Sequence, residues 1–440
     1  MSYFEMAAIA LAGLAVIQTL LVLWQIHENL RLMRSRFRAN HAQDLGRRVA
    51  LIAPCKGLEL ELERNLAPLF AQDYSNYELL LVVESETDPA VAAIRRLIAR
   101  NPQRDARLIV AGLANDCGQK VHNLRVATEN LPAGIEVLAF VDSDARPASD
   151  WLRHLVERLD RADVGASSGY RWFMPVNGTW AEQALVSVNG SVAAMLGGKR
   201  LNMVWGGSWA IRRDTFDEIN LRDAWQGTLS DDLVASRMLY LAGKKVNFEP
   251  HCMVASPLGA TVASAFEFAR RQYIIGRFYA PARWALCMVG ISLAKLVVAS
   301  GLVALVLFVT GTRGVWCYSQ IGALATLVAL GAVRAIYRQR VASVCLATHA
   351  DKLAVSRRHD YLAWPVFSLV NWLCLLSSLG SDMVTWRGNR YQILRGGQIR
   401  LVQRDTASAP SVDRKAPRPP HFQRGAGVRK NRRARSGRQR

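Results

Sequence analysis

The chain has 440 residues, 51% of them hydrophobic, and a formal net charge of +21. An ordinary soluble enzyme rarely combines these properties, and here the apolar residues gather in long uncharged runs. The 7 cysteines are scattered without a Cys-x-x-Cys spacing, so we expect reduced, structural thiols. The sequence therefore predicts a membrane protein with a soluble domain inserted between its apolar runs.

The first apolar run extends from Met6 to Trp24 without a charge, which is long enough to cross the hydrocarbon core of a bilayer. Several arginines follow it, from Arg31 to Arg48, and the cytoplasmic flanks of membrane helices are rich in such residues. A cleaved signal peptide is the alternative, but no basic segment precedes the run, and the run is too long. We therefore expect residues 1–30 to form a transmembrane anchor and the next segment to lie in the cytoplasm.

From Arg48 onward, short apolar runs alternate with segments of helical periodicity, as in a domain built from βαβ units. Helices are expected at Leu58–Phe70, Pro89–Arg100, Gly118–Asn130, Asp150–Leu159 and Trp180–Leu196. Buried strands are expected at Val49–Ala53, Tyr77–Val83, Arg107–Ala111, Val137–Val141 and Val164–Trp172. This pattern predicts an α/β domain with a parallel sheet over residues 48–260.

Acidic residues directly follow two of these strands. Glu84 and Glu86 follow the second strand, and Asp142 and Asp144 follow the fourth. Parallel strands end at one edge of a sheet, where open α/β folds bind ligands, so these side chains should converge on one crevice. In an extended chain Asp142 and Asp144 point the same way and can face one divalent cation or one polyphosphate. That is the setting of a nucleotide-sugar site, although an Asp-x-Asp sequence can also mark a solvated turn.

Two later segments could complete such a crevice. The segment Gly206–Ser208 contains two residues without side chains, so its backbone amides could approach a ligand. Ser230 is a good helix N-cap, and Asp231 and Asp232 would lie in the first turn of the helix that follows. Capping explains one of these two carboxylates, and the other is a candidate base.

The sequence Phe266–Arg283 places apolar and aromatic residues on one helical face and arginines on another. Just before a membrane segment, this pattern is typical of a helix lying in the bilayer interface, and we expect one at residues 261–283. The tail, residues 404–440, is basic and rich in Pro, Gly and Ser, so it should be disordered.

Further apolar runs predict C-terminal membrane segments within residues 284–385, at Val289–Thr310, Gly314–Val333 and Tyr361–Ser381. The first two can cross the membrane and return, which brings the arginines after Val333 back inside. A crossing by the third run would leave the basic tail outside. We therefore expect Tyr361–Ser381 to dip into the membrane and return, with helix breaks at Pro365 and Asn371; a simple crossing is the alternative.

Several motifs follow one another between Arg48 and Arg283. They are Pro54-Cys-Lys-Gly57, Gln72-Asp-Tyr74, the acidic strand end Glu84–Asp88, Lys120 with Asn123, Asp142-Ser-Asp144 and Ser230-Asp-Asp232. In order and spacing this set resembles the processive and lipid-directed family 2 glycosyltransferases, most closely the ceramide glucosyltransferases. The resemblance implies a Rossmann-like GT-A fold, a nucleotide-sugar donor such as UDP-glucose, a divalent metal such as Mn²⁺ or Mg²⁺, and inversion at the anomeric carbon.

The resemblance also implies roles for these residues. Asp144, with help from Asp142, would hold the metal, which neutralises charge on the leaving diphosphate. Asp232 matches the family's third aspartate and would take the proton of the acceptor hydroxyl. The remaining contacts are expected from Lys120 and Asp142 to the nucleotide sugar, and from Gly207, Ser208 and Asp231 to the sugar or acceptor.

Two positions depart from the family pattern. Where the family has an aspartate for the nucleotide, this chain has Glu84-Ser-Glu86, so we expect Glu84 or Glu86 to make that contact. Where the family has Gln/Arg-x-x-Arg-Trp, this chain reads Ala-Arg-Arg-Gln-Tyr. We expect Arg271, Gln272 and Tyr273 from this segment to contact the donor, with a guanidinium on the diphosphate.

The leading hypothesis is a hexosyltransferase that acts on the hydroxyl of a membrane lipid, such as ceramide, a hopanoid or another glycolipid precursor. It would work on the cytoplasmic face of a bacterial inner membrane or its equivalent, with no nucleic-acid partner. A polysaccharide synthase is an alternative, but it needs more membrane helices around its active site. A non-catalytic membrane scaffold is another, and the presence of Asp142, Asp144 and Asp232 together argues against it.

Overall fold

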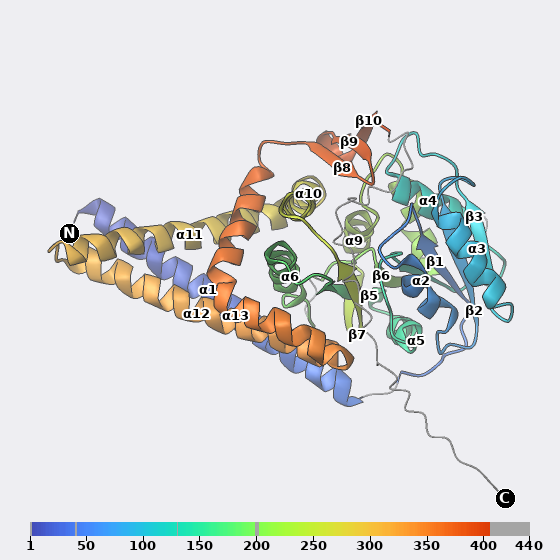
Figure 1. Cartoon of the computed structure of the whole chain (residues 1–440), viewed down its shortest axis with the longest axis horizontal. Coiled ribbons are helices and arrows are strands. Elements are labelled where there is room, and N and C mark those ends of the chain that lie inside the picture. Colours follow the sequence, from blue (N-terminus) through green and yellow to red (C-terminus); the bar gives the residue numbers. More distant parts are fainter. Residues whose placement is uncertain (1, 40–41, 130, 199–201, 405–440) are drawn as a thin grey trace, which may run out of the picture. The chain divides into compact units, whose positions relative to one another are not determined.

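The computed structural model describes residues 2–39, 42–129, 131–198 and 202–404 (Figure 1). The predicted disordered tail lies outside the described residues, apart from Arg404. The predicted soluble domain is built on a sheet whose strand order is β3-β2-β1-β4-β6-β5-β7. Its strands are β1 Val49–Pro54, β2 Tyr77–Val83, β3 Ala106–Val110, β4 Val137–Val141, β5 Val164–Pro175, β6 Ser208–Arg212 and β7 Lys245–Leu258.

The first four strands are parallel, as predicted, so β1, β2 and β4 end at the same edge of the sheet. The expectation of a parallel sheet is wrong for β6, which runs antiparallel to both β4 and β5. Because of this reversal, β6 begins at the edge where β4 ends. The glycines just before Ser208 are thereby brought to the carboxylates just after Val141.

Helices cover both faces of the sheet. Leu51 and other residues on one face pack against α2 Leu62–Phe70, α3 Ala90–Arg100 and α5 Trp151–Glu157. Ile52 and other residues on the opposite face pack against α4 Gln119–Glu129, α7 Arg213–Glu218, α8 Leu221–Ala224 and α9 Asp231–Leu241. Because both faces of these strands are buried, their sequences are continuously apolar and do not alternate between apolar and polar residues.

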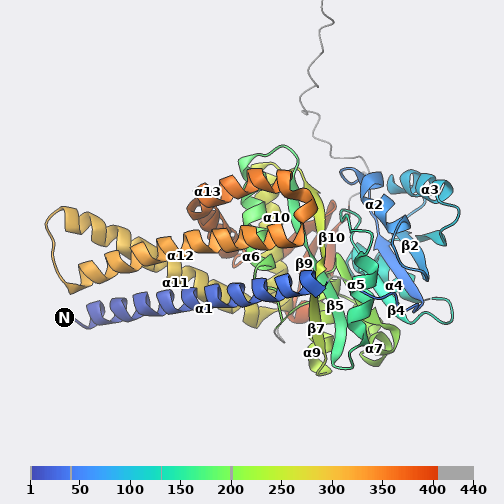
Figure 2. The same cartoon turned by 90° about the horizontal axis from the view of Figure 1, so that it is seen from below.

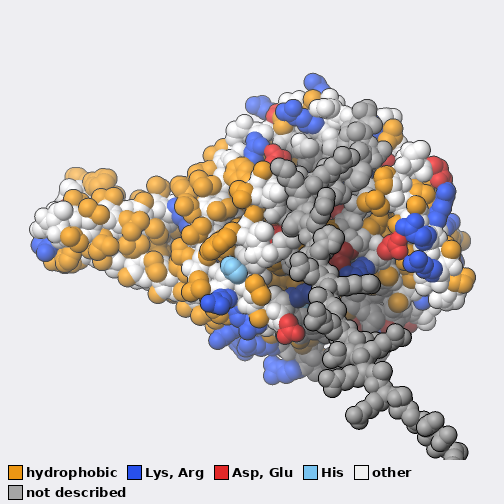
Figure 3. Space-filling model, in the orientation of Figure 1, with side chains coloured by type: hydrophobic (Ala, Val, Ile, Leu, Met, Phe, Trp, Pro, Cys, Tyr) orange, Lys and Arg blue, Asp and Glu red, His pale blue; other side chains and the backbone are white. Residues whose placement is uncertain are grey.

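Within the described chain, three helices are long and apolar enough to cross a membrane: α1 Tyr3–Ala39, α11 Pro281–Val309 and α12 Val315–Cys345. They pack side by side and extend away from the sheet (Figures 1 and 2). Hydrophobic side chains cover their projecting ends (Figure 3). These helices contain the predicted anchor and the first two predicted C-terminal segments, and the protein is accordingly a membrane protein.

The third predicted segment belongs to α13 Ala350–Ser377, which is not among the three candidate spans. The expected break is a bend inside a continuous helix that contains Pro365 (Figure 1). Proline lacks an amide hydrogen and clashes with the preceding turn, so it bends helices. The first arm of α13 is fixed to α12 by a buried ion pair between Asp360 and Arg338, 2.6 Å apart. That Tyr361–Ser381 dips into the membrane and returns stays a prediction.

The helix predicted for the interface is α10 Val262–Tyr279, which packs against α6 Trp180–Ala193, α11 and α13. Its location at a bilayer surface stays a prediction. After α13 the chain forms a small antiparallel sheet, for which the sequence analysis made no prediction. Its strands are β8 Met383–Trp386, β9 Asn389–Ile393 and β10 Ile399–Gln403. This C-terminal sheet lies near α10 and α4 (Figure 1), and its Tyr391 hydroxyl accepts a hydrogen bond from the amide of Gln119.

Candidate active site

Lys120 joins three of the predicted site segments. It lies in the first turn of α4, and its Nζ is 2.8 Å from Asp142 Oδ1 and 3.1 Å from Asp231 Oδ1. The same ammonium donates to the carbonyl oxygen of Gly206 at 3.2 Å. Burial alone would lower the pKa of Lys120, but the two carboxylates hold it above its ordinary value. Lys120 therefore stays charged and holds the end of β4, the start of β6 and the start of α9 together.

Asp144 has one engaged and one free carboxylate oxygen. Its Oδ2 is 3.2 Å from Arg171 Nη1, which reaches it from β5. Its Oδ1 is buried and has no hydrogen-bond partner among the described residues. Burial raises the pKa of Asp144, Arg171 opposes this effect, and Asp142 adds to it. A buried oxygen without a partner is unfavourable by itself, so this atom is suited to bind a cation.

The net charge of the carboxylate cluster around Lys120 also favours a bound cation. Four carboxylates (Asp142, Asp144, Asp231 and Asp232) face two cations, Lys120 and Arg171. When all four are ionised, the cluster carries an excess of two negative charges in a partly buried place. Mg²⁺ and Mn²⁺ prefer oxygen ligands and would balance this excess. Asp142 and Asp144 therefore fit the predicted divalent metal.

The two acidic residues at the start of α9, Asp231 and Asp232, have different surroundings. Asp232 Oδ1 accepts hydrogen bonds from Ser230 Oγ at 2.6 Å and from the amide of Leu233 at 2.8 Å. Its Oδ2 accepts from the amide of Gly206 at 3.1 Å. Asp231 is only 4% exposed and pairs with Lys120. Both residues also serve the helix start, but Asp232 is the more accessible carboxylate.

Asp231 provides a pH-dependent prediction for the metal-free protein. Burial raises the pKa of Asp231 from 3.8 to about 7, with Lys120 opposing and Asp232 adding. Between these values the folded protein binds a proton that the unfolded chain has lost, so the contribution of Asp231 to stability falls as pH rises from about 4 to about 7. We expect the melting temperature, measured in detergent with a chelator, to fall over this range less steeply in Asp231→Asn than in wild type. An equal slope in both proteins would contradict this assignment.

The segment Gly206–Ser208 is held both by close packing and by hydrogen bonds. A Cβ at Gly206 would lie 2.6 Å from Asp231 Oδ2, and one at Gly207 would lie 2.6 Å from Asp142 Oδ2. Both positions therefore need glycine for the close approach of backbone to carboxylates. The prediction that Ser208 contacts sugar or acceptor is wrong for its side chain, which is 0% exposed. Its hydroxyl accepts from Trp151 Nε1 at 2.7 Å and donates to the carbonyl oxygen of Cys252 at 2.9 Å.

The two glutamates proposed for the nucleotide differ in position. Glu84 lies at the end of β2 and pairs with Lys56 Nζ at 2.6 Å, with 14% of its side chain exposed. Glu86 is 60% exposed and pairs with Arg95 on α3. Glu84 therefore belongs to the carboxyl edge of the sheet, whereas Glu86 lies on the surface. The structure favours Glu84 for the predicted contact.

The three residues of α10 that were predicted to contact the donor, Arg271, Gln272 and Tyr273, lie in different surroundings. Arg271 and Arg171 both lie over the Phe268 ring, at 5.1 and 5.3 Å. Burial, with the charge of Arg171, lowers the pKa of Arg271 to about 10, so an anion near both guanidinium groups would be stabilised. Tyr273 instead donates its hydroxyl to Asn371 of α13 at 2.5 Å, and Gln272 is exposed. The structure brings Arg271 toward the carboxylates but not Gln272 or Tyr273.

A family model described as glycosyl transferase family 21 matches residues 7–399. The chain belongs to this family. The match confirms the resemblance found in the sequence, and the parallel-rich sheet with helices on both faces confirms the predicted α/β fold of GT-A type with membrane helices.

Curated relatives match shorter stretches of this family 21 chain. The ceramide glucosyltransferase of Komagataella phaffii is 32% identical over 126 residues, which are 27% of this chain and 24% of the relative. That of Candida albicans is 28% identical over 151 residues, 30% of this chain and 27% of the relative. The matched part thus spans about a quarter of the curated relatives. Among solved structures, a mannosyltransferase from Pyrobaculum calidifontis in complex with GDP-Man and Mn²⁺ is 16% identical, with a TM-score of 0.48 over 85% of this chain and 97% of that one.

The sequence analysis missed several residues at this family 21 site. Arg171 pairs with Asp144, but a single arginine near the end of a strand has no motif that would reveal it. Tyr170, beside it, accepts a hydrogen bond from Asn189 Nδ2 at 3.3 Å. Burial raises the pKa of Tyr170 to about 12, with Arg171 opposing and Asp232 adding, so the phenol lies close to both charged groups. Asn189 Oδ1 is buried without a partner among the described residues.

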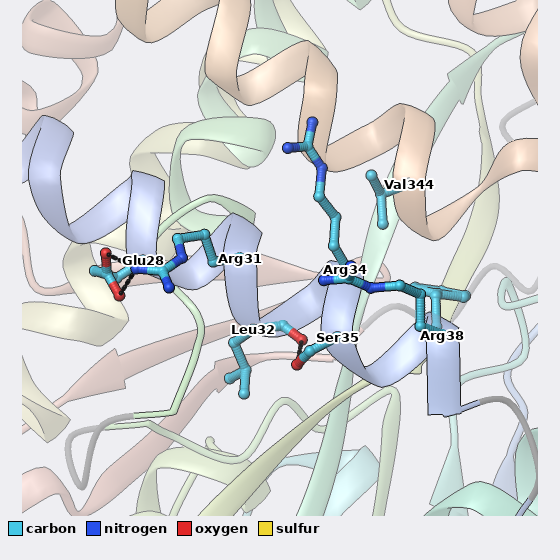
Figure 4. A pocket seen from close by; sticks show the side chains of 8 residues that line it. Glu28, Arg31, Leu32, Arg34, Ser35, Arg38 and Val344 are labelled. Carbon is cyan, nitrogen blue, oxygen red and sulfur yellow. Dashed lines mark hydrogen bonds and ion pairs between the residues drawn. The ribbon is translucent and has the colours of Figure 1, made fainter.

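Two other features of the family 21 chain lie outside this site. A recess of about 710 Å³ lies against α1 and includes Val344 of α12, and Figure 4 shows the pair Glu28–Arg31 on its wall. None of the predicted site residues line it. A buried group of His154, Glu249 and His251 could hold a metal ion, with ligand atoms within 4.8 Å of one another. Arg158 already neutralises Glu249 at 2.6 Å, so we assign this group a structural role.

Proposed function

We propose that the protein transfers a hexose from a UDP-hexose, UDP-glucose first among them, to the hydroxyl of a membrane lipid, with inversion at the anomeric carbon. The observation that carries the proposal is the position of Asp232 beside the metal-suited pair Asp142 and Asp144, joined through Gly206 and Lys120. The names of the curated relatives support ceramide as the first acceptor to test. The catalytic domain would face the cytoplasm, where nucleotide sugars are made.

On the donor side, Asp144 would bind a divalent cation through its free Oδ1, with Asp142 beside it. The bound cation supplies charge neutralisation for the leaving diphosphate. Arg271 lies next to Arg171 and would contact the same phosphates. Glu84, held by Lys56, would bind the nucleoside at the neighbouring strand end. Lys120 keeps the loops in place while the donor is bound.

On the acceptor side, Asp232 is held by the hydroxyl of Ser230 and by backbone amides. These donors fix its orientation and leave lone pairs free on Oδ2. In a single displacement, the acceptor oxygen forms a bond to the anomeric carbon as the bond from that carbon to the diphosphate breaks. The hydroxyl proton passes to Asp232. Tyr170 lies nearby, as does Asn189, whose Oδ1 has no partner in the described part of the chain, and both would hydrogen-bond the polar head of the lipid.

The test compares lipid extracts from cells that produce wild-type protein, Asp232→Asn or no protein. The proposal predicts a lipid that is heavier than its parent by one hexose, present only with wild type, and mass fragmentation identifies both sugar and lipid. A polysaccharide product without a new lipid would support the synthase alternative. Identical lipid profiles in cells with wild-type protein and cells with no protein, with ceramide and other hydroxylated lipids supplied, would contradict lipid glycosylation.

A further inference from the structure

The turn between β8 and β9 has an unfavourable residue at its tip. Trp386 pairs with Asn389, so Arg387 and Gly388 form a two-residue hairpin loop. Both have positive φ, 50° for Arg387 and 77° for Gly388. Such a turn favours Asn or Asp before the glycine, because other side chains are strained in the left-handed region. Strained residues of this kind gather at functional sites, so Arg387 is a candidate functional residue.

That side chain is linked through Glu59 to the loop of the proposed metal ligands. The Arg387 guanidinium forms an ion pair with Glu59. Glu59 Oε1 also accepts a hydrogen bond from Ser143 Oγ at 3.4 Å, and Ser143 lies between Asp142 and Asp144. Arg387 is 37% exposed, yet burial lowers its pKa. The guanidinium side chain is thus partly accessible to solvent and to a ligand.

The rest of the C-terminal sheet is attached to the loop of the proposed base. The amide of Ile399 donates to the carbonyl oxygen of Gly227 at 2.9 Å. The Tyr279 hydroxyl accepts from the amide of Leu229 at 2.8 Å and donates to the carbonyl oxygen of Gly397 at 2.5 Å. The sheet is therefore fixed next to Ser230–Asp232 at one point and next to Asp142–Asp144 at another. These contacts fix the C-terminal sheet, and with it Arg387, at the edge of the large sheet where the carboxylates lie.

We propose that Arg387 binds the diphosphate of the nucleotide-sugar donor, and that Glu59 occupies its guanidinium when no donor is bound. The inference rests on the proposed function and adds a donor-binding residue to it. An arginine fork matches two phosphate oxygens, which makes it suited to this ligand. On donor binding, the guanidinium exchanges the Glu59 carboxylate for phosphate and stabilises the charge that develops on the leaving diphosphate. The family position filled by Arg271 is shifted in this chain, and Arg387 supplies a second guanidinium.

The decisive variant is Arg387→Asn, because asparagine suits the turn but cannot bind phosphate as a cation. We expect its melting temperature to equal or exceed that of wild type, because strain in the turn is relieved. We expect its affinity for UDP with Mn²⁺, measured by titration calorimetry on the full chain in detergent, to fall on the order of 10- to 100-fold. The donor KM should rise with it. Arg390→Asn, an exposed arginine on β9, is the matched control and should bind UDP like wild type.

A second variant separates ligand binding from a structural role of the ion pair. Glu59→Gln removes the competitor for the guanidinium, so UDP affinity should stay equal or increase. If the pair were only structural, Arg387→Asn and Glu59→Gln would both lower the melting temperature, and UDP affinity would not follow Arg387. Wild-type affinity in Arg387→Asn would overturn the inference while leaving the proposed function intact. Failure of the wild-type protein to bind UDP under any metal condition would instead count against the proposed function itself.

Discussion

Replacing Asp232 by asparagine is expected to lower kcat for glycosyl transfer by roughly 10²- to 10⁴-fold, the usual contribution of a general base. UDP binding with Mn²⁺ should change little, because a base acts only when the acceptor hydroxyl loses its proton. The asparagine amide keeps the shape of the carboxylate, so the protein should stay folded. The measurement is the turnover of UDP-glucose with a lipid acceptor, alongside calorimetric titration with UDP.

Ser230→Ala is the matched control for this experiment. It removes the hydroxyl that donates to Asp232 and caps α9, which costs stability of about 1 kcal/mol, but it keeps the carboxylate. It should therefore lower the melting temperature and reduce kcat far less than Asp232→Asn, because the amides of Leu233 and Gly206 still hold the carboxylate. Loss of UDP affinity in Asp232→Asn, as large as that in a metal-ligand variant, would refute the assignment of Asp232 as the base.

Replacing Asp144 by alanine should abolish both transfer and metal-dependent donor binding. The substitution removes Oδ1, which no described residue hydrogen-bonds and which is suited to the cation, and leaves the Arg171 guanidinium without its carboxylate. Asp144 would hold a cation that neutralises diphosphate charge in both the bound and the reacting state, so binding and kcat should fall together. Titration with UDP should give the same weak affinity with Mn²⁺ and with a chelator.

Asp163→Ala removes a surface carboxylate that pairs with Lys245 and serves as the control for loss of an acidic residue. It should preserve the gain in UDP affinity that Mn²⁺ gives to wild type. If Asp144→Ala also preserves this gain, the cation is not held by Asp144, and the proposed metal site is wrong.

Much of the fold could be predicted because burial leaves a direct signal in the sequence. Residues 49–53 and 137–141 are apolar without interruption, since helices cover both faces of the sheet. The direction of β6 could not be predicted, because strand polarity depends on the partner strand and not on the residues of the strand itself. The strand β7 was missed because Lys245–Leu258 contains charged residues and proline that weaken the apolar pattern.

The position of the carboxylates proposed for the donor site could be predicted because they follow strands that share an edge, but their partners could not. Because β6 is antiparallel to both β4 and β5, β5 runs in the same direction as β4, and this places Arg171 beside Asp144. The reversal at β6 that produces this arrangement could not itself be predicted. Arg387 lies even farther from Asp144 along the sequence. It belongs to a sheet whose short, polar strands gave no sequence signal. The role of Ser208 was misassigned because the sequence does not reveal that Trp151 and the carbonyl of Cys252 occupy its hydroxyl.

The central claim is that one displacement, with Asp232 as base, moves a hexose from UDP to a lipid. The most direct test is the anomeric configuration of the product, measured by NMR after purified protein has acted on UDP-glucose, which is the α-anomer, and ceramide with Mn²⁺. Inversion predicts a β-linked glucosyl lipid from wild type and at least about 10²-fold less of it from Asp232→Asn in the same time. An α-linked product, or release of free glucose without a glycolipid, would contradict it.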